Sequence, residues 1–200
     1  MSCINIPIVR FDACNPVILP GEIVALYVAG INAADFTDWT DSVEFLSRVN
    51  NALPNDADVL RKLTVIGDMP LPTAVEKEIS GGRLSEVRTL RVINIEMDEA
   101  TPENYEFIVA TETSTGLHCK VWIETMAGVR FGSNSGITGR LKIRPVLTRG
   151  SGEIEKYIGT FKWNSLTSPG RIDVVNADLY NLITDGLDDV LTDENDLIFT

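Results

Sequence analysis

A chain of 200 residues, of which 44% are hydrophobic, is long enough for one domain with a sizeable core. Its best apolar run, Ile23 to Gly30, is far shorter than the roughly 18 to 20 residues that cross a bilayer, so we expect no membrane partner. The formal charge of −12 argues against tight binding of nucleic acid, because phosphate affinity comes mainly from clustered Lys and Arg.

The first third of the chain predicts strands and one short helix. Apolar stretches over Ile4 to Val9 and Ile23 to Ala29 are separated by prolines and a glycine, and they predict two strands. Asp41 to Val49 has apolar residues near helical spacing, with Asp41 as a candidate N-cap. Leu63 to Ile66 predicts a further short strand.

A long β-hairpin is predicted next. Its arms are Thr73 to Ile79 and a stretch from Leu84 to Met97, joined by glycines that supply the positive φ a tight turn needs. Strands commonly run about 5 to 6 residues, so an arm near twice that length is expected to extend beyond its own core and contact a partner subunit. The turn residues are our first candidate subunit-interface set: Ser80, Gly81, Gly82 and Arg83.

A second helix is predicted from Thr101, a good cap, and Pro102, which fits the first helical position. Its expected buried stripe is Tyr105, Ile108 and Val109, at i, i+3 and i+4. Short glycine-rich links between the strands that follow predict an antiparallel meander. These predicted strands are Leu117 to Glu124, Val129 to Phe131, Arg140 to Val146 and Glu155 to Trp163.

The end of the chain changes in character. From Ile172 to Thr200 there are eight acids and no Lys or Arg, so this segment carries −8 of the total charge. We therefore predict a β domain over residues 1–175 and an acidic amphipathic arm over residues 176–200, with a partly disordered acidic tail as the alternative. Apolar residues near helical spacing are the second candidate interface set: Leu179, Ile183, Leu187, Val190 and Leu191.

Residues that could carry chemistry are few. A Ser-His-Asp or Cys-His nucleophile system depends on the single histidine, His118, and a strand would place its neighbour Cys119 on the opposite face. The three cysteines show no close-paired ligand spacing, and the glycine-rich segment 132–139 lacks the GK[ST] ending of a phosphate loop. We therefore predict no catalytic residue, no metal site and no cofactor, and we expect the protein not to be an enzyme.

The order of motifs between Glu99 and Asp173 resembles a known family. The resembling motifs are the capped helix with Asn104 to Phe107, the strand Cys119 to Glu124, the glycine-rich Gly132 to Gly139, Arg149 to Glu153, and Gly159 to Trp163. Together they resemble the distal half of tail-tube proteins of long-tailed bacteriophages, especially the type associated with Bacteroidetes hosts. No single motif is specific, so the resemblance depends on their order.

The resemblance implies a mainly β fold of two packed antiparallel sheets, a β-sandwich-like arrangement with a flanking helix. It implies six subunits to a ring and rings stacked into a hollow phage tail tube, through which DNA passes without specific binding. The hairpin around Gly81 and Gly82 would correspond to the projecting loop that reaches neighbouring subunits. The implied partners are further copies of the chain and other tail proteins, and the implied location is the virion, after synthesis in the host bacterial cytoplasm.

Two other interpretations stay open. One is another virion ring or decoration protein, such as a tail terminator, a baseplate ring or a capsid auxiliary protein. The other is a carbohydrate-binding or hydrolytic β-sandwich, in which Trp39, Trp122 and Trp163 line a sugar platform, although large aromatics in strands more often belong to a core or an interface.

Overall fold

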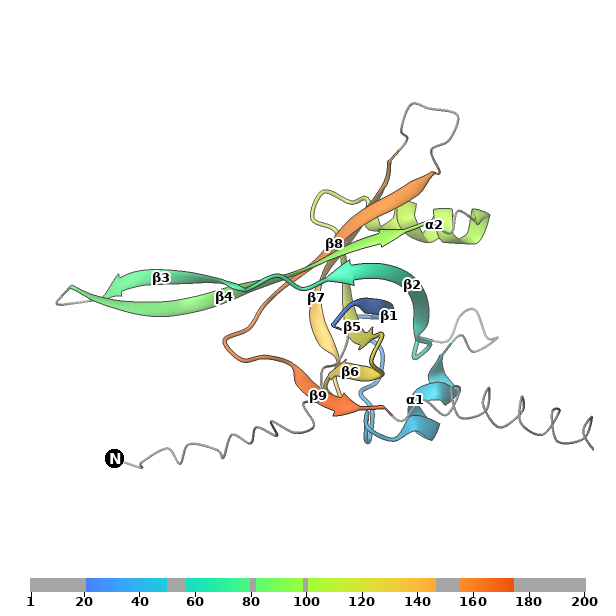
Figure 1. Ribbon diagram of the computed structural model, residues 1–200, viewed down its shortest axis with the longest axis horizontal. Helices are drawn as coiled ribbons and strands as arrows, with labels where there is room; N and C mark the ends of the chain where they lie inside the picture. The colour runs from blue at the N-terminus through green and yellow to red at the C-terminus, as the bar shows by residue number, and fades with distance from the viewer. Residues whose placement is uncertain (1–20, 50–56, 80–81, 99–100, 147–154, 175–200) are drawn as a thin grey trace, which may run out of the picture.

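The computed structural model describes residues 21–49, 57–79, 82–98, 101–146 and 155–174 (Figure 1). These ranges hold nine strands and two short helices, so the predicted mainly β fold is confirmed. No helix within them has the length and apolar character that crossing a membrane requires. In chain order the elements are β1 Ile23–Gly30, α1 Ser42–Arg48, β2 Arg61–Asp68, β3 Thr73–Ile79, β4 Arg83–Met97, α2 Pro102–Thr111, β5 Leu117–Thr125, β6 Val129–Gly132, β7 Ile137–Val146, β8 Lys156–Asn164 and β9 Gly170–Asp173.

Six strands close into an antiparallel barrel in the order β1, β2, β4, β8, β7 and β5, because β5 pairs back to β1. β6 and β9 extend the sheet beyond β5, and β3 pairs with β4 alone among the described strands. The predicted meander of the strands after α2 is confirmed for β5 with β6 and for β7 with β8, but it is wrong for β6 and β7, because β7 pairs with β5 instead. Closure removes the exposed edges that an open sheet would leave.

One cluster of buried side chains fills the barrel. It forms because inward and outward residues alternate along each strand, as in the burial pattern of β7, where every second residue from Ile137 to Ile143 is buried. Burying each large aliphatic side chain contributes about 1.5–3 kcal/mol, so this cluster is the main source of stability. Its members from the six barrel strands are Ile23, Leu26, Val28, Leu63, Val65, Ile93, Ile95, Met97, Cys119, Val121, Ile123, Ile137, Leu141, Ile143, Tyr157, Phe161 and Trp163.

Helix α2 packs against β7 and adds Ile108, which is fully buried, to the barrel core. Its N-terminus is as predicted, with the Thr101 side chain accepting a hydrogen bond from the backbone N–H of Asn104 at 3.2 Å. The predicted buried stripe is wrong, because Tyr105 and Val109 are 49% and 50% exposed. The side facing the barrel is instead formed by Ile108, the partly buried Phe107 and the buried Thr111.

A second, smaller cluster lies outside the barrel, under α1. Alternate residues of β1 point outward and are covered, which explains why this strand is buried on both faces. The predicted helix and its Asp41 cap are confirmed, and Phe45 is the helix residue that packs into the cluster. The cluster consists of Ala25, Tyr27, Ala29, Ala33, Phe36, Trp39, Phe45, Leu60 and Trp122.

The remaining strand predictions are confirmed with shifted bounds. β7 begins at Ile137, so the predicted loop 132–139 contributes its last residues to the barrel, and β9 was not predicted. The predicted strand Ile4 to Val9 and the acidic arm over 176–200 lie outside the described residues.

Candidate assembly surface

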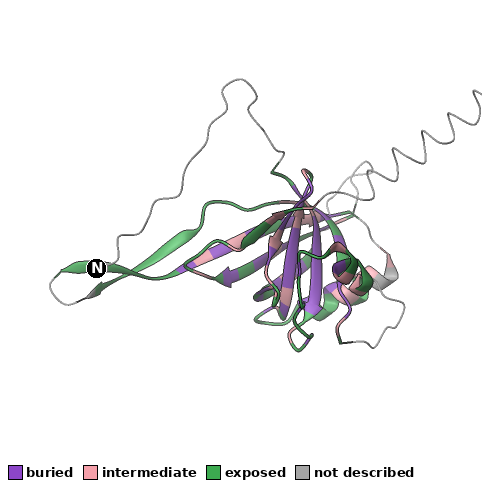
Figure 2. Ribbon diagram, turned by 90° about the horizontal axis from the view of Figure 1, so that it is seen from below, coloured by how far each residue is buried: buried purple, intermediate pink, exposed green. Residues whose placement is uncertain are grey.

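The hairpin formed by β3 and the first half of β4 projects away from the barrel (Figure 1). Its two arms are paired from Thr73 opposite Leu90 to Ile79 opposite Arg83. Described side chains from Thr73 to Arg88 are exposed, as the green arm in Figure 2 shows. The hairpin therefore contributes little to the chain's own core, as predicted for an arm that extends beyond it.

Between Arg88 and the tip, both outer edges of this hairpin are unpaired within the described part of the chain. Nearer the barrel, the backbone C=O of Thr89 accepts a hydrogen bond from the N–H of Ser165 at 3.0 Å. β3 pairs with β4 alone, and β4 pairs with β8 only from Leu90 onward. An unpaired edge presents a row of backbone N–H and C=O groups that can pair with another chain. A two-stranded hairpin is marginally stable by itself in water, so an arm of this length is expected to be held by a partner.

A β-bulge near the middle of the hairpin separates its charges by face. The register shifts between Val75 and Glu76, which leaves Val87 as the extra residue on β4 and places Glu76 directly opposite Glu86. The Thr89 hydroxyl donates a hydrogen bond to the Glu86 carboxylate and orients it. We define the acidic face of the hairpin as Glu76, Glu78 and Glu86.

The opposite face of the hairpin is basic and partly apolar. Val75 is 37% exposed there, opposite Arg88. The bases on this face are Lys77, Arg83 and Arg88, all exposed. Sequence alternation alone does not reveal this separation, because the bulge changes which residues of β4 share a face.

Of the predicted interface residues, Gly82 and Arg83 lie at the tip of the hairpin. Gly82 has a φ of +72°, the left-handed conformation that the turn was predicted to need, and Arg83 begins β4. The other predicted interface residues lie outside the described ranges: Ser80, Gly81, Leu179, Ile183, Leu187, Val190 and Leu191.

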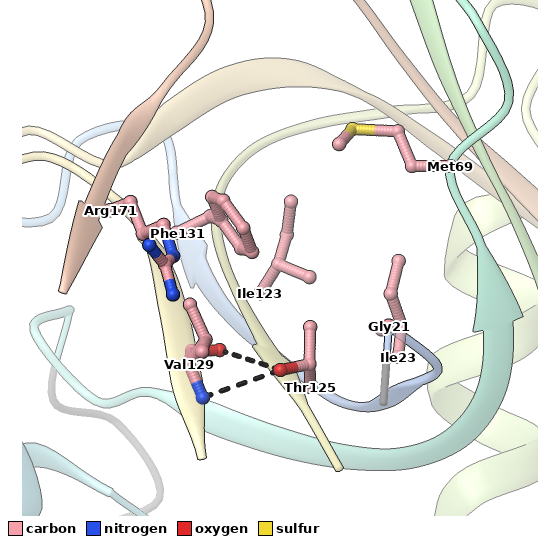
Figure 3. A pocket seen from close by; sticks show the side chains of 8 residues that line it. All are labelled: Gly21, Ile23, Met69, Ile123, Thr125, Val129, Phe131 and Arg171. Atoms are coloured by element: carbon pink, nitrogen blue, oxygen red, sulfur yellow. Dashed lines mark hydrogen bonds between the residues drawn. The ribbon is translucent and has the colours of Figure 1, made fainter. Parts of the chain in front are cut away.

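A small pocket of about 220 Å³ opens at the end of the barrel where β1 begins and β5 ends. The close-up in Figure 3 shows Ile23, Ile123 and Phe131 around it, with Met69 across the opening. The Thr125 hydroxyl that lines it is already bonded to the backbone of Val129, with the N–H and C=O each at 3.3 Å (Figure 3). The charged residue of the described lining, Arg171, pairs with Asp173 at 3.0 Å, so the pocket is a mainly apolar recess without an acid–base pair.

A buried charge lies under α1. Arg130 is 2% exposed, and its guanidinium lies 3.6 Å from the centroid of the Phe45 ring. Its Nη2 is 3.3 Å from the Glu124 carboxylate, which also accepts a hydrogen bond from the Tyr27 hydroxyl at 3.0 Å. Burial, and then the nearby Glu124 charge, raise the pKa of Tyr27. This network attaches α1 to the barrel, and the sequence contained no signal for it.

The two residues considered for nucleophilic chemistry are separated by the sheet. His118 is exposed on the outside of β5, and Cys119 is 1% exposed in the barrel core, as alternation along the strand predicted. Burial raises the pKa of the Cys119 thiol to about 12, so it stays protonated and unreactive near neutral pH. Within the described residues, no three His, Cys, Asp or Glu side chains are grouped so that they could hold a metal ion.

Comparison with known proteins does not assign the chain to a family. No family model, no curated protein and no solved structure matches it.

Proposed function

We propose that the protein is a structural subunit that assembles with copies of itself into rings, and that these rings stack into the tail tube of a long-tailed phage. The proposal joins the resemblance in the second half of the chain to one structural observation. That observation is the exposed hairpin with two unpaired edges, which has no packing partner within the described residues.

The division of the chain into a packed body and a projecting arm supports this role. The barrel satisfies its own strand edges, whereas the hairpin leaves backbone groups and exposed valines for a neighbour. In this proposal the barrel is the ring-forming body, arranged as the two packed layers of the tail-tube fold. α2 is then the flanking helix, and the hairpin is the loop that reaches the next subunit.

The charge of the chain also supports a tube that conducts DNA. A net charge of −12 repels phosphates over about 8 to 10 Å at physiological salt, which favours passage without adhesion. In this proposal the partners are copies of the chain and other tail proteins, and the protein performs no catalysis.

Negative-stain electron microscopy of the purified chain tests this function. We expect hollow rings that stack into tubes as the protein concentration rises. Single rings that never stack would instead favour a terminator, baseplate or decoration protein. Particles of monomer size at every concentration would contradict the proposal.

A further inference from the structure

The outward face of the barrel is strongly basic over two neighbouring strands, although the chain as a whole is acidic. On β7 the outward residues Arg140, Lys142 and Arg144 alternate with the buried Leu141 and Ile143. On β8, Lys162 lies directly opposite Arg140, also pointing outward. No outward position of either strand carries an acid. We define the basic face as Arg140, Lys142, Arg144 and Lys162.

These four bases make no ion pair within the described residues. The ion pairs seen among the described residues use other cations, including Arg48, Lys120, Arg130, Lys156 and Arg171. Arg140 and Lys142 reach only neutral oxygens, such as the Thr115 hydroxyl at 2.9 Å and the Ser114 carbonyl at 3.4 Å. Like charges directly opposite each other on a sheet are destabilising, and Arg140 beside Lys162 is such a pair.

The acidic face of the hairpin has the complementary arrangement. Glu76 lies directly opposite Glu86, a second like-charge pair, and Glu78 follows two residues along β3. Glu76 and Glu78 are exposed and make no ion pair among the described residues. Repulsion between like charges therefore destabilises each face when it is alone, and contact between the acidic face and the basic face would reduce that repulsion.

The charged residues of the two faces also have the same spacing. Both are antiparallel sheet surfaces, so charges repeat about every 7 Å along a strand and about 5 Å between opposite residues. Glu76, Glu86 and Glu78 therefore lie at the same intervals as Arg140, Lys162 and Lys142. Sheets that pack face to face lie about 10 Å apart, which leaves room for the two rows of charged side chains to meet.

We infer that the basic face of one subunit binds the acidic face of the hairpin from a second copy of the chain. This inference rests on the proposed function and names the surface that the projecting hairpin contacts. A nucleic acid is a weaker candidate for the same face, because the remaining charge of the chain repels a polyanion.

Charge exchange tests the contact in the full-length chain. We expect Glu76→Lys with Glu86→Lys, and separately Arg140→Glu with Lys162→Glu, each to raise the concentration for half-assembly by at least about tenfold, a loss of about 1.4 kcal/mol. The chain carrying all four reversals should assemble again, because its hairpin and its receiving face are once more complementary. Circular dichroism on every variant separates lost assembly from lost folding.

A matched control changes charge elsewhere. Glu106→Lys with Glu112→Lys changes two exposed acids of the α2 region by the same total charge as Glu76→Lys with Glu86→Lys, and its assembly should match that of the wild type. The contact should also weaken as salt rises, because exposed charges are screened.

Several outcomes would overturn the inference. One is a wild type that assembles while both double reversals assemble equally well, which contradicts this contact and leaves the proposed function intact. Another is a folded four-reversal chain that stays monomeric. Loss of retention on heparin by the basic-face variant, with assembly unchanged, would assign that face to a polyanion. A wild type that never assembles contradicts the proposed function and this contact together.

Discussion

Cys119 shows how the barrel changes the chemistry of one side chain. It is 1% exposed, and burial raises the pKa of its thiol from 9.0 to about 12. The folded state therefore favours the protonated thiol, whereas the unfolded state ionises above about pH 9. This contribution to stability is fully present below pH 9 and is lost as the pH rises toward 12.

The expected size follows from the linkage between pKa and stability. Between about pH 8 and about pH 10, the unfolding free energy of the wild type should fall by about 1.4 kcal/mol more than that of Cys119→Ala, which cannot ionise. Urea unfolding at several pH values measures both slopes. Parallel curves for the two proteins would show that the thiol titrates normally in the folded state.

At the scale of residues, the environment of a side chain could be predicted when it is set by nearby residues in the chain. The opposite orientation of His118 and Cys119 follows from alternation along one strand, so the sequence was sufficient. The burial of Arg130 depends on Tyr27 of β1 and on Phe45, which packing of α1 on the barrel brings to it. No pattern near Arg130 in the sequence contains that information.

At the scale of elements, helix starts were predictable and helix faces were not. Asp41 and Thr101 cap their helices through side-chain bonds to nearby N–H groups, which are local interactions. The buried side of α2 is set by β7, to which it is joined through Thr111. The helical spacing of Tyr105 and Val109 therefore predicted the wrong buried side of α2.

Thr111 provides a test of this connection between α2 and the barrel. Its hydroxyl donates to the Ile108 carbonyl at 2.8 Å and accepts from the backbone N–H of Ile143 at 3.0 Å. Thr111→Val keeps the shape but leaves that buried N–H without its partner, so we expect a loss of about 1–3 kcal/mol. Exposed Thr113→Val should change stability by less than about 0.5 kcal/mol. Equal thermal unfolding of the two variants would contradict this role for Thr111.

The general form of the hairpin could be predicted from the sequence, but its strand register could not. Its arms, its glycine turn and its length beyond the core follow from the sequence. The bulge at Val87 does not, and it determines that Glu76 and Glu86 face each other. The two charged faces of the arm are consequences of register, which a single strand does not reveal.

At the scale of the whole molecule, the number of strands was more predictable than their neighbours. β4 pairs with β8 across a long stretch of chain, and β5 pairs back to β1, so closure depends on contacts far apart in sequence. The basic face exists only because β7 and β8 bring Arg140 beside Lys162. The mainly β fold could therefore be predicted from the sequence, whereas the closed barrel and its basic face could be found only in the structure.

The proposed role as an assembly subunit depends on the hairpin being held by another copy of the chain. The most direct measurement is light scattering over a concentration series of the wild type and of a variant in which residues 76–87 are replaced by Asn-Gly. Val75 and Arg88 are paired opposite each other, so a two-residue turn can join them without disturbing the barrel. The wild type is expected to reach masses several times its 22.0 kDa chain, with the shortened variant folded and monomeric. A wild type that remains at 22.0 kDa throughout, or a shortened variant that assembles equally well, would contradict it.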